Sequence, residues 1–352
     1  MKKICMIVPS FTAKGGIAAV VNGYRGSELE KKYAIHYIET YCDGTKPAKL
    51  FKAVTAYLCF IKELIVFKPD IIHIHSSFGA SFYRKLPFIW MGSVLKIPIV
   101  NHIHGSELKR FFWDAHPFVK ALKKKAYQSC DMVIALTEEW KTLFIEAFGI
   151  QTVKAINNYG RVCSLITKEH RPDTVLFMGF LSKLKGCMDI PEIVYQVKKE
   201  IPRVQFILAG KGSCEEVRQI EQMLKDYGIQ ENVQFPGWIT GSEKESALQS
   251  AVLFLLPSYT EGMPMSILEA MGHGLPIVSS NVGGIPELVE QGRNGYMCDP
   301  GDTKAFADAI VTLLKDAQLR NTMGKESIRI IEESYSLEHH IDALASVYES
   351  SC

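Results

Sequence analysis

Two glutamates, Glu261 and Glu269, lie eight residues apart where an apolar run typical of a strand gives way to a helical pattern. Paired carboxylates can hydrolyse glycosidic bonds, but the two groups must then lie about 5 to 9.5 Å apart. Eight helical residues span roughly 12 Å. Hydrolysis by this pair is therefore disfavoured, and we consider instead that the two carboxylates hold a bound molecule.

The segment between the two glutamates predicts the start of a helix. Pro264 is expected at the first helical position, where its missing N–H leaves no hydrogen bond unmade. The N–H groups of Met263, Met265 and Ser266 would then point at one spot, together with the positive end of the helix dipole. Such a spot suits an anionic phosphate.

The two carboxylates would flank this phosphate position. Helical side chains lean toward the N-terminus, so Glu269 could reach a ribose beside the phosphate. Glu261, on the preceding loop, could face a sugar. A buried carboxylate needs a partner, and Glu269 lies among the apolar residues Ile267, Leu268, Ala270 and Met271.

Apolar runs alternate with amphipathic segments in both halves of this chain of 352 residues. That alternation predicts parallel sheets covered by helices, and the length allows two cores. The fold class is therefore α/β, with two Rossmann-like domains facing across a cleft at 1–158 and 172–335. A linker is expected from Asn157 to Asp173, and a final helix at about 336–352 is expected to cross back onto the first domain. The predicted strands are Ile4–Val8, Ile35–Ile38, Ile71–Ile74, Ile99–Ile103, Met132–Ala135, Val153–Ile156, Val175–Met178, Val204–Ala209, Val233–Phe235, Val252–Leu256 and Ile277–Ser279.

Paired glycines follow the first predicted strand. Gly15 and Gly16 precede an apolar helical stretch, so the backbone can approach a ligand closely there and offer N–H donors. An ordinary turn would also explain them. The GxGxxG fingerprint of dinucleotide-binding enzymes is absent after this strand, which opposes a nicotinamide dehydrogenase.

Positive charge is concentrated in the first half of the chain. Residues 1–160 hold 22 Lys and Arg against 12 Asp and Glu. Basic side chains mixed with aromatic ones suit an anionic lipid surface, although a solvated basic face is the alternative. Nucleic acid is not expected, because no recognised binding motif accompanies these residues. The mixture comprises Arg84, Lys85, Lys109, Arg110, Lys120, Lys123, Lys124 and Lys125, with Phe82, Tyr83, Phe88, Trp90, Phe111, Phe112 and Trp113.

The run from Phe51 to Phe67 is strongly apolar but shorter than the roughly 20 residues that span a bilayer. We expect a core helix there, with a helix lying in a membrane interface as the alternative. The N-terminal segment lacks the features of a signal peptide. Nine cysteines without CxxC spacing indicate neither a disulfide framework nor a zinc site. A cytoplasmic, reduced protein is expected.

Five segments together resemble the retaining glycosyltransferases of family 4, the group 1 type with a GT-B fold. The likeness runs over nearly the whole chain and is strongest from Leu176 to Asp302. In the first half, PIVNHIHGSE (Pro98–Glu107) resembles the segment that carries the active-site histidine of the family, and its alignment selects His104. The five segments are FMGFLSKLKG (Phe177–Gly186), LAGKGS (Leu208–Ser213), VQFPGW (Val233–Trp238), LPSYTEGMPMSILEAMGHGLPIVSSNVGGIPELV (Leu256–Val289) and NGYMCDPGD (Asn294–Asp302).

The resemblance implies roles for particular residues. The implied catalytic residues are His104, Lys185 and Glu261. Lys185 would face the pyrophosphate and neutralise charge that grows as the nucleotide leaves. Gly210 and Gly212 would form a loop near the base, and His75 could line the acceptor cleft. The implied donor-binding residues are Gly15, Gly16, Gly179, Lys183, Gly210, Gly212, Gly262, Met263, Pro264, Met265 and Glu269.

One position departs from the family pattern. Many relatives carry Arg five residues before the motif lysine, where this chain has Phe180. One phosphate contact is therefore missing or displaced. Either Lys183 substitutes for the arginine or Lys185 acts alone.

The resemblance implies transfer of a sugar from a nucleotide-sugar donor, with retention and without a metal, a cofactor or a protein nucleophile. The acceptor would be a growing, polyprenyl-linked cell-surface oligosaccharide of capsule, exopolysaccharide or O-antigen type, at the inner face of the plasma membrane. A sugar-nucleotide epimerase of GT-B fold and a non-catalytic sugar-nucleotide-binding protein remain alternatives. The donor nucleotide and its sugar are left open.

Overall fold

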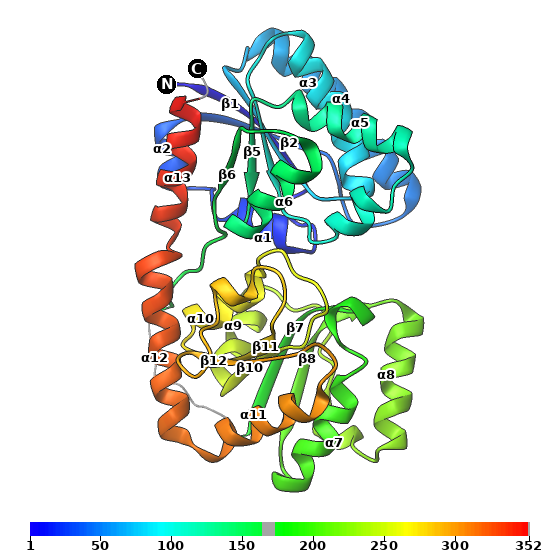
Figure 1. Cartoon of the computed structure of the whole chain (residues 1–352), viewed down its shortest axis with the longest axis vertical. Coiled ribbons are helices and arrows are strands. Elements are labelled where there is room, and N and C mark those ends of the chain that lie inside the picture. The colour runs from blue at the N-terminus through cyan, green and yellow to red at the C-terminus, as the bar shows by residue number, and fades with distance from the viewer. Residues whose placement is uncertain (164–172, 351–352) are drawn as a thin grey trace. The chain divides into compact units, whose positions relative to one another are not determined.

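The computed structural model describes residues 1–163 and 173–350. It divides into two compact units (Figure 1). The first unit comprises Met1–Asn158 and the C-terminal helix α13 (Leu337–Ser350), and the second comprises Tyr159–Ser336. Most of the expected linker lies outside the described residues. Each unit is built on its own parallel sheet, as the alternating sequence pattern predicts.

The first unit holds a six-stranded sheet in the order β2-β1-β3-β4-β5-β6. Adjacent strands run parallel, and His75 of β3 lies beside His102 of β4 in the register. Parallel sheets covered on both faces have nearly continuous apolar strands, and β1 and β4 are buried over almost their whole length. The strands are β1 (Lys3–Val8), β2 (Ala34–Glu39), β3 (Ile71–Ser76), β4 (Ile99–Ile103), β5 (Met132–Ala135) and β6 (Val153–Ala155).

Helices of the first unit cover this sheet. The long helix α3 packs beside α4, and α4 packs beside α5 (Figure 1). The core between helices and sheet is rich in aromatic rings, such as Phe82 stacked on Tyr127. The helices are α1 (Gly16–Asn22), α2 (Glu28–Lys32), α3 (Lys46–Val66), α4 (Ala80–Val94), α5 (Pro117–Gln128) and α6 (Glu138–Phe148), with a π-helical turn at Lys109–Trp113.

Two expectations for the first unit were wrong. The run Phe51–Phe67, expected in the core, forms most of α3, of which only Ala56 and Phe60 are buried. Conversely, several of the basic and aromatic side chains that were expected to form a surface are buried in the core. Lys85 is buried and donates to the Thr40 hydroxyl at 2.6 Å, and Lys123 donates to the Phe111 carbonyl. Helical periodicity shows which side chains share a face but not which of two apolar faces meets the sheet. The remaining buried members are Phe82, Phe88, Phe111 and Phe112.

The second unit also holds a six-stranded parallel sheet, in the order β12-β11-β10-β7-β8-β9. All the strands predicted in this half appear, but β12 was missed. It lies at the edge of the sheet, with Tyr296 and Met297 half-exposed, and its apolar run after Gly295 has only three residues. The strands are β7 (Thr174–Leu181), β8 (Gln205–Gly212), β9 (Val233–Gln234), β10 (Leu253–Leu256), β11 (Ile277–Ser280) and β12 (Gly295–Cys298).

Three of the helices described in the second unit begin at side-chain caps. Ser213 and Glu216 form a capping box at the start of α8, which satisfies two backbone donors there. Asp302 and Asp316 cap α11 and α12 with their side chains. The helices are α7 (Ile190–Glu200), α8 (Cys214–Asp226), α9 (Gly241–Ser250), α10 (Met265–Gly272), α11 (Thr303–Lys315) and α12 (Ala317–Ser334), with 3-10 turns at Lys183–Lys185, Gln230–Asn232 and Ile285–Glu287.

Candidate functional site

The order of strands in the second unit defines one place where a ligand should bind. From β7 the chain continues to β8 and β9 on one side of the sheet, and then to β10, β11 and β12 on the other. Open parallel sheets bind ligands beyond the carboxyl ends of the strands, at the point where the strand order reverses. Here that point lies between β7 and β10. The turn after β7 carries Lys185, and the loop after β10 carries Glu261.

Lys185 and Glu261 meet at this point. The Lys185 ammonium lies 2.5 Å from Oε1 of Glu261, and the Ser258 hydroxyl donates to the same oxygen at 2.7 Å. Glu261 is only 4% exposed, whereas the Lys185 side chain is 29% exposed. The carboxylate is therefore a fixed, buried acceptor, and the ammonium is the part that can turn toward a ligand. The sequence predicted both residues but not their ion pair.

The helix predicted near Pro264 begins one residue later than expected. Pro264 is the N-cap of α10 rather than its first residue, and Met265 begins the helix. No side chain caps this helix start in the described part of the chain, so its first N–H groups face the site without a side-chain acceptor. Gly262 and Met263 are buried before it. The Gly262 carbonyl accepts from Gly284 at 2.8 Å, which ties the loop to the segment after β11.

Gly283 explains why this loop can be so close to its neighbour. It has a φ of +52°, in the left-handed region that favours glycine, and an added Cβ would lie 1.9 Å from the Glu261 carbonyl oxygen. Gly186 allows an equally close approach to Pro257, before the loop. It has a φ of +69°, and an added Cβ would lie 1.9 Å from the Pro257 carbonyl oxygen. Gly186 and Gly283 therefore allow neighbouring backbone to pack closely against the segment that carries Glu261. Sequence reasoning missed both, although each follows a motif residue.

Glu269 lies in α10 and is partly exposed. Its Oε1 is 2.9 Å from the Lys244 ammonium of α9. Glu245, the next residue of α9, lies 2.8 Å from Nε2 of His273, and Nδ1 of His273 is 2.8 Å from the Glu269 carbonyl. Helix α9 therefore contacts the Glu269 side chain through Lys244. It also reaches the Glu269 carbonyl through Glu245 and His273. Sequence reasoning missed Lys244, because no spacing signal links it to a residue 25 positions away.

The predicted glycine loop near a base is not a loop. Gly210 and Gly212 belong to β8, where they lie beside Gly179 and Leu181 of β7. A Cβ on Gly210 would lie 1.9 Å from the Gly179 carbonyl oxygen, and one on Gly212 would lie 2.3 Å from that of Leu181. These glycines allow two strands to approach closely. Only the expectation of a loop is wrong, because packing and ligand binding both exclude a side chain. Gly210 and Gly212 stay predictions as donor contacts.

Phe180 and Lys183 lie beside this strand end. Phe180, in place of the family arginine, is exposed and packs against Trp238 with 5.1 Å between ring centroids. The Lys183 side chain is exposed, and its backbone N–H donates to Glu216 at 3.3 Å. Lys183 shares a 3-10 turn with Lys185, and its role as a substitute for the arginine stays a prediction.

In the first unit, Gly15 and Gly16 lie at the start of α1. Gly15 is the N-cap, with a φ of +126°, and an added Cβ would meet no atom within 4 Å. Its conformation rather than crowding therefore requires glycine. No side chain caps α1 among the described residues. Both residues stay predictions as phosphate contacts.

His104 follows β4 and belongs to a cluster of imidazoles on one face of the sheet. Nδ1 of His75 shares a hydrogen bond with Nε2 of His104 at 2.9 Å, and Nδ1 of His73 shares one with the Tyr348 hydroxyl at 2.5 Å. His102 stacks on His104 with 4.2 Å between centroids. His75 is fully buried, so the structure does not show it lining an open surface.

Burial governs the charge of this cluster. Desolvation lowers the pKa of His73 and of His104 to about 3, and His340 adds to the effect by its charge. The pKa values of His75 and His102 are lowered for the same reason. These imidazoles are neutral at neutral pH. His104 can therefore donate or accept a hydrogen bond but adds no fixed positive charge.

Among the residues that the structure describes, two groups of side chains have ligand atoms close enough for a metal ion. The ligand atoms of His73, His75 and His102 lie within 4.8 Å of one another, as do those of Cys163, Glu245 and His273. The first group contains no carboxylate to offset a cation, and buried Lys85 already lowers the pKa of His75 by its charge. The second contains the His273–Glu245 hydrogen bond. The sequence indicated neither group.

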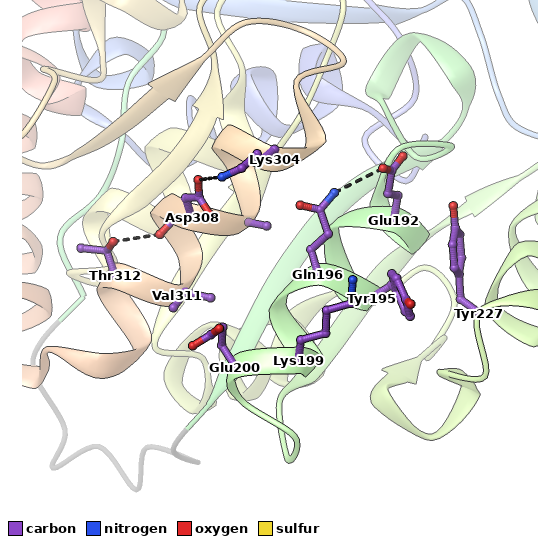
Figure 2. A pocket seen from close by; sticks show the side chains of 11 residues that line it. Glu192, Tyr195, Gln196, Lys199, Glu200, Tyr227, Lys304, Asp308, Val311 and Thr312 are labelled. Carbon is purple, nitrogen blue, oxygen red and sulfur yellow. Dashed lines mark hydrogen bonds and ion pairs between the residues drawn. The ribbon is translucent and has the colours of Figure 1, made fainter.

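A groove lies elsewhere in the second unit, between α7 and α11 (Figure 2). Charged side chains line it, and several pair locally, such as Lys304 with Asp308 at 2.6 Å. None of the predicted site residues lines this groove. It is a surface feature of two packed helices, separate from the carboxyl edge of the sheet.

Comparison with known proteins gives matches in both units. Residues 17–158 match the family model described as Glycosyltransferase Family 4, and residues 172–316 match the one described as Glycosyl transferases group 1. The N-acetyl-alpha-D-glucosaminyl L-malate synthase of Bacillus anthracis is 27% identical over 79% of this chain and 74% of that protein. The amylovoran biosynthesis glycosyltransferase AmsK of Erwinia amylovora is 27% identical over 70% of this chain and 62% of that protein.

A solved structure shares the whole fold. The Anabaena protein Alr3699/HepE, in complex with UDP and glucose, superposes with a TM-score of 0.78 over 99% of this chain and 100% of that one. Its sequence identity is 20%. At this identity the likeness concerns the fold, which has two Rossmann-like domains of GT-B type.

Proposed function

The matches in both units and the GT-B fold support a family 4 glycosyltransferase, and we propose that this chain is a retaining, metal-independent one. It transfers a sugar from a nucleotide-sugar donor to a growing lipid-linked oligosaccharide of the cell surface. The observation that carries the proposal is the Lys185–Glu261 pair between the ends of β7 and β10, beside the uncapped start of α10.

The donor is proposed to bind at this carboxyl edge. Glu269 holds the ribose hydroxyls, because a carboxylate accepts two hydrogen bonds in a fixed direction. The start of α10 and Lys185 hold the diphosphate, since a helix start and an ammonium both favour negative charge. Glu261 faces the sugar. The HepE structure contains UDP and glucose, which supports a nucleotide-sugar donor.

The chemistry follows from the charge that develops on the departing phosphate. The acceptor hydroxyl attacks the anomeric carbon beside the leaving group, and the departing phosphate oxygen takes the hydroxyl proton. Lys185 and the α10 start stabilise the negative charge on the leaving diphosphate. The sugar becomes positively charged in the transition state, which the neutral imidazole of His104 does not oppose.

The acceptor and the location belong to the same proposal. Family 4 resemblance of this type and the name of AmsK, a biosynthesis enzyme for amylovoran, support a cell-surface polysaccharide product. A polyprenyl-linked acceptor would place the enzyme at the inner face of the plasma membrane. The relative named N-acetyl-alpha-D-glucosaminyl L-malate synthase supports testing a small acceptor as well.

One observation favours a second candidate, a non-catalytic sugar-nucleotide-binding protein. Phe180 replaces the family arginine and packs against Trp238, which leaves one phosphate contact missing. Product analysis separates the candidates. The transferase predicts release of nucleoside diphosphate that requires an acceptor and a glycoside with the donor's anomeric configuration. An epimerase predicts a changed donor without acceptor, and a binding protein predicts no turnover. Inversion of configuration would contradict the retaining mechanism.

A further inference from the structure

Helix α3 carries an apolar stripe that faces away from its own domain. The stripe residues recur at three- and four-residue intervals, so they share one face over about 22 Å of helix. Their exposed fractions run from 45% for Ile61 to 72% for Phe51. The buried residues Ala56 and Phe60 lie on the opposite face. The α3 stripe comprises Leu50, Phe51, Val54, Leu58, Ile61 and Ile65.

The neighbouring helix α4 adds to this surface. Tyr83, Trp90 and Val94 are 43% to 80% exposed and lie on one face of α4, because they are separated by seven and four residues. Leu95 follows them and is exposed as well. Helices α3 and α4 pack side by side (Figure 1). Exposed apolar side chains gathered in this way mark a binding surface, whereas scattered ones do not.

The charges carried by α3, α4 and the residues just after α4 are nearly all positive, although Lys52 is paired with Glu39 of β2 at 2.6 Å. Residues 46–66 and 80–97 hold seven basic side chains and one acidic one, Glu63. Glu63 is engaged with His36 at 2.7 Å, and of the basic side chains only Lys85 is buried. The basic residues are Lys46, Lys49, Lys52, Lys62, Arg84, Lys85 and Lys96.

We infer that the α3 stripe, with the exposed side chains of α4, docks on an anionic lipid surface. Apolar side chains enter the acyl boundary, while lysines at the flanks meet lipid phosphates, as in helices that lie in a membrane interface. No helix in the described ranges has the length and apolarity needed to cross a membrane.

A second copy of the chain fits this surface less well. A two-fold interface places the same patch on both partners, so the lysines that flank one stripe would face those of the other. An anionic surface turns the same charges into attraction. Charge complementarity therefore favours lipid over self-association.

The inference deepens the proposed function, because a lipid-linked acceptor requires the enzyme at a membrane, but its test does not depend on catalysis. The test is sedimentation of the full chain with vesicles of phosphatidylcholine, with and without phosphatidylglycerol. The double variant Leu58→Glu, Ile61→Glu places two carboxylates in the stripe at exposed positions. The matched control is Gln318→Glu, Asn321→Glu on exposed positions of α12, with the same spacing and charge.

The expected result is binding to vesicles that contain phosphatidylglycerol, weakened by salt, with at least about tenfold weaker binding for the stripe variant. The control variant should bind like the native chain. Equal thermal unfolding and equal nucleotide affinity of the variants, measured by calorimetry, show that fold and donor site are intact. Absence of nucleotide binding by the native chain would count against the proposed function alone.

Any of three results with vesicles would overturn the inference. The native chain could fail to bind both kinds of vesicle, it could bind both equally whatever their lipid charge, or the stripe variant could bind as well as the control. A native dimer that the stripe variant converts to a monomer, seen by light scattering, would assign the stripe to self-association instead.

Discussion

The Lys185 ammonium lies 2.5 Å from the Glu261 carboxylate, at the reversal of strand order in the second unit. Glu261 is buried and Lys185 is partly exposed, so the pair joins a fixed anion to a cation that can swing outward. A diphosphate arriving at α10 offers Lys185 a competing anion. Donor binding is therefore expected to loosen the pair.

Replacement of Lys185 by alanine should slow sugar transfer by roughly 100-fold or more, because the charge on the leaving diphosphate loses its cation. Steady-state kinetics with the donor measure this. Lys185→Arg should recover part of the rate, and Lys325→Ala, on an exposed face of α12, is the control. Unchanged turnover in Lys185→Ala would refute the assigned role.

The same substitution should also destabilise the second unit. It leaves Glu261 buried with the Ser258 hydroxyl but without its cation, and breaking such a pair costs about 3 kcal/mol when both groups are buried, and less here because Lys185 is partly exposed. Urea unfolding measures the loss. The double variant Lys185→Ala, Glu261→Gln should recover stability without recovering turnover. A double variant less stable than Lys185→Ala would show that the carboxylate has another partner.

Lys244 is predicted to position Glu269. Lys244→Ala should weaken nucleotide binding by severalfold, and Glu269→Ala should weaken it by about tenfold or more, because hydrogen bonds to charged groups contribute about 1.5 to 3 kcal/mol. Combining the two should add little to Glu269→Ala alone. Calorimetry on the four proteins gives the coupling. Fully additive losses would show that Lys244 acts independently of Glu269.

Phe180→Arg should strengthen donor binding. Phe180 is exposed, so the substitution is expected to leave the core intact, and arginine can make a bidentate contact with phosphate. If Lys183 substitutes for the missing arginine, Lys183→Ala should weaken the native chain but have less effect in Phe180→Arg. Calorimetry measures each affinity. An unchanged affinity in Phe180→Arg would show that position 180 does not face the phosphates.

Acid should destabilise the first unit through its buried imidazoles. The folded pKa of His73 is about 3, below its ordinary value of 6.5, because burial disfavours the charged ring. In the unfolded chain the ring gains a proton below pH 6.5, so stability is lost as pH falls from 6.5 toward 3. From pH 6.5 to 5 this amounts to roughly 2 kcal/mol per such histidine. His73→Gln should flatten the dependence in urea unfolding, whereas an equally steep loss would contradict it.

Much of the fold follows from the sequence. All the predicted strands appear, and most are apolar runs that a parallel sheet buries. The edge strand β12 was missed because it offers only three apolar residues after Gly295. Helix α3 was assigned to the core because it is apolar on two opposite faces, and composition cannot tell which face meets the sheet.

The parts of the candidate site that depend on one short segment could be predicted from the sequence. The helix start at Met265, next to Pro264, follows from local rules. The partner Lys244 does not, because a side-chain contact between α9 and α10 depends on tertiary packing. Gly210 was expected in a loop but lies in β8, where the Gly179 carbonyl of the next strand requires glycine.

The central claim is that the carboxyl edge of the second unit binds a nucleotide-sugar donor. Calorimetric titration of UDP, GDP and ADP, each with and without common attached sugars, tests it on the native chain and on Glu269→Ala, with Glu332→Ala on an exposed face of α12 as control. The account predicts that one nucleotide binds tightly to the native chain and the control, and at least about tenfold more weakly to Glu269→Ala. No binding of any nucleotide at millimolar concentration, or equal binding by Glu269→Ala, would contradict it.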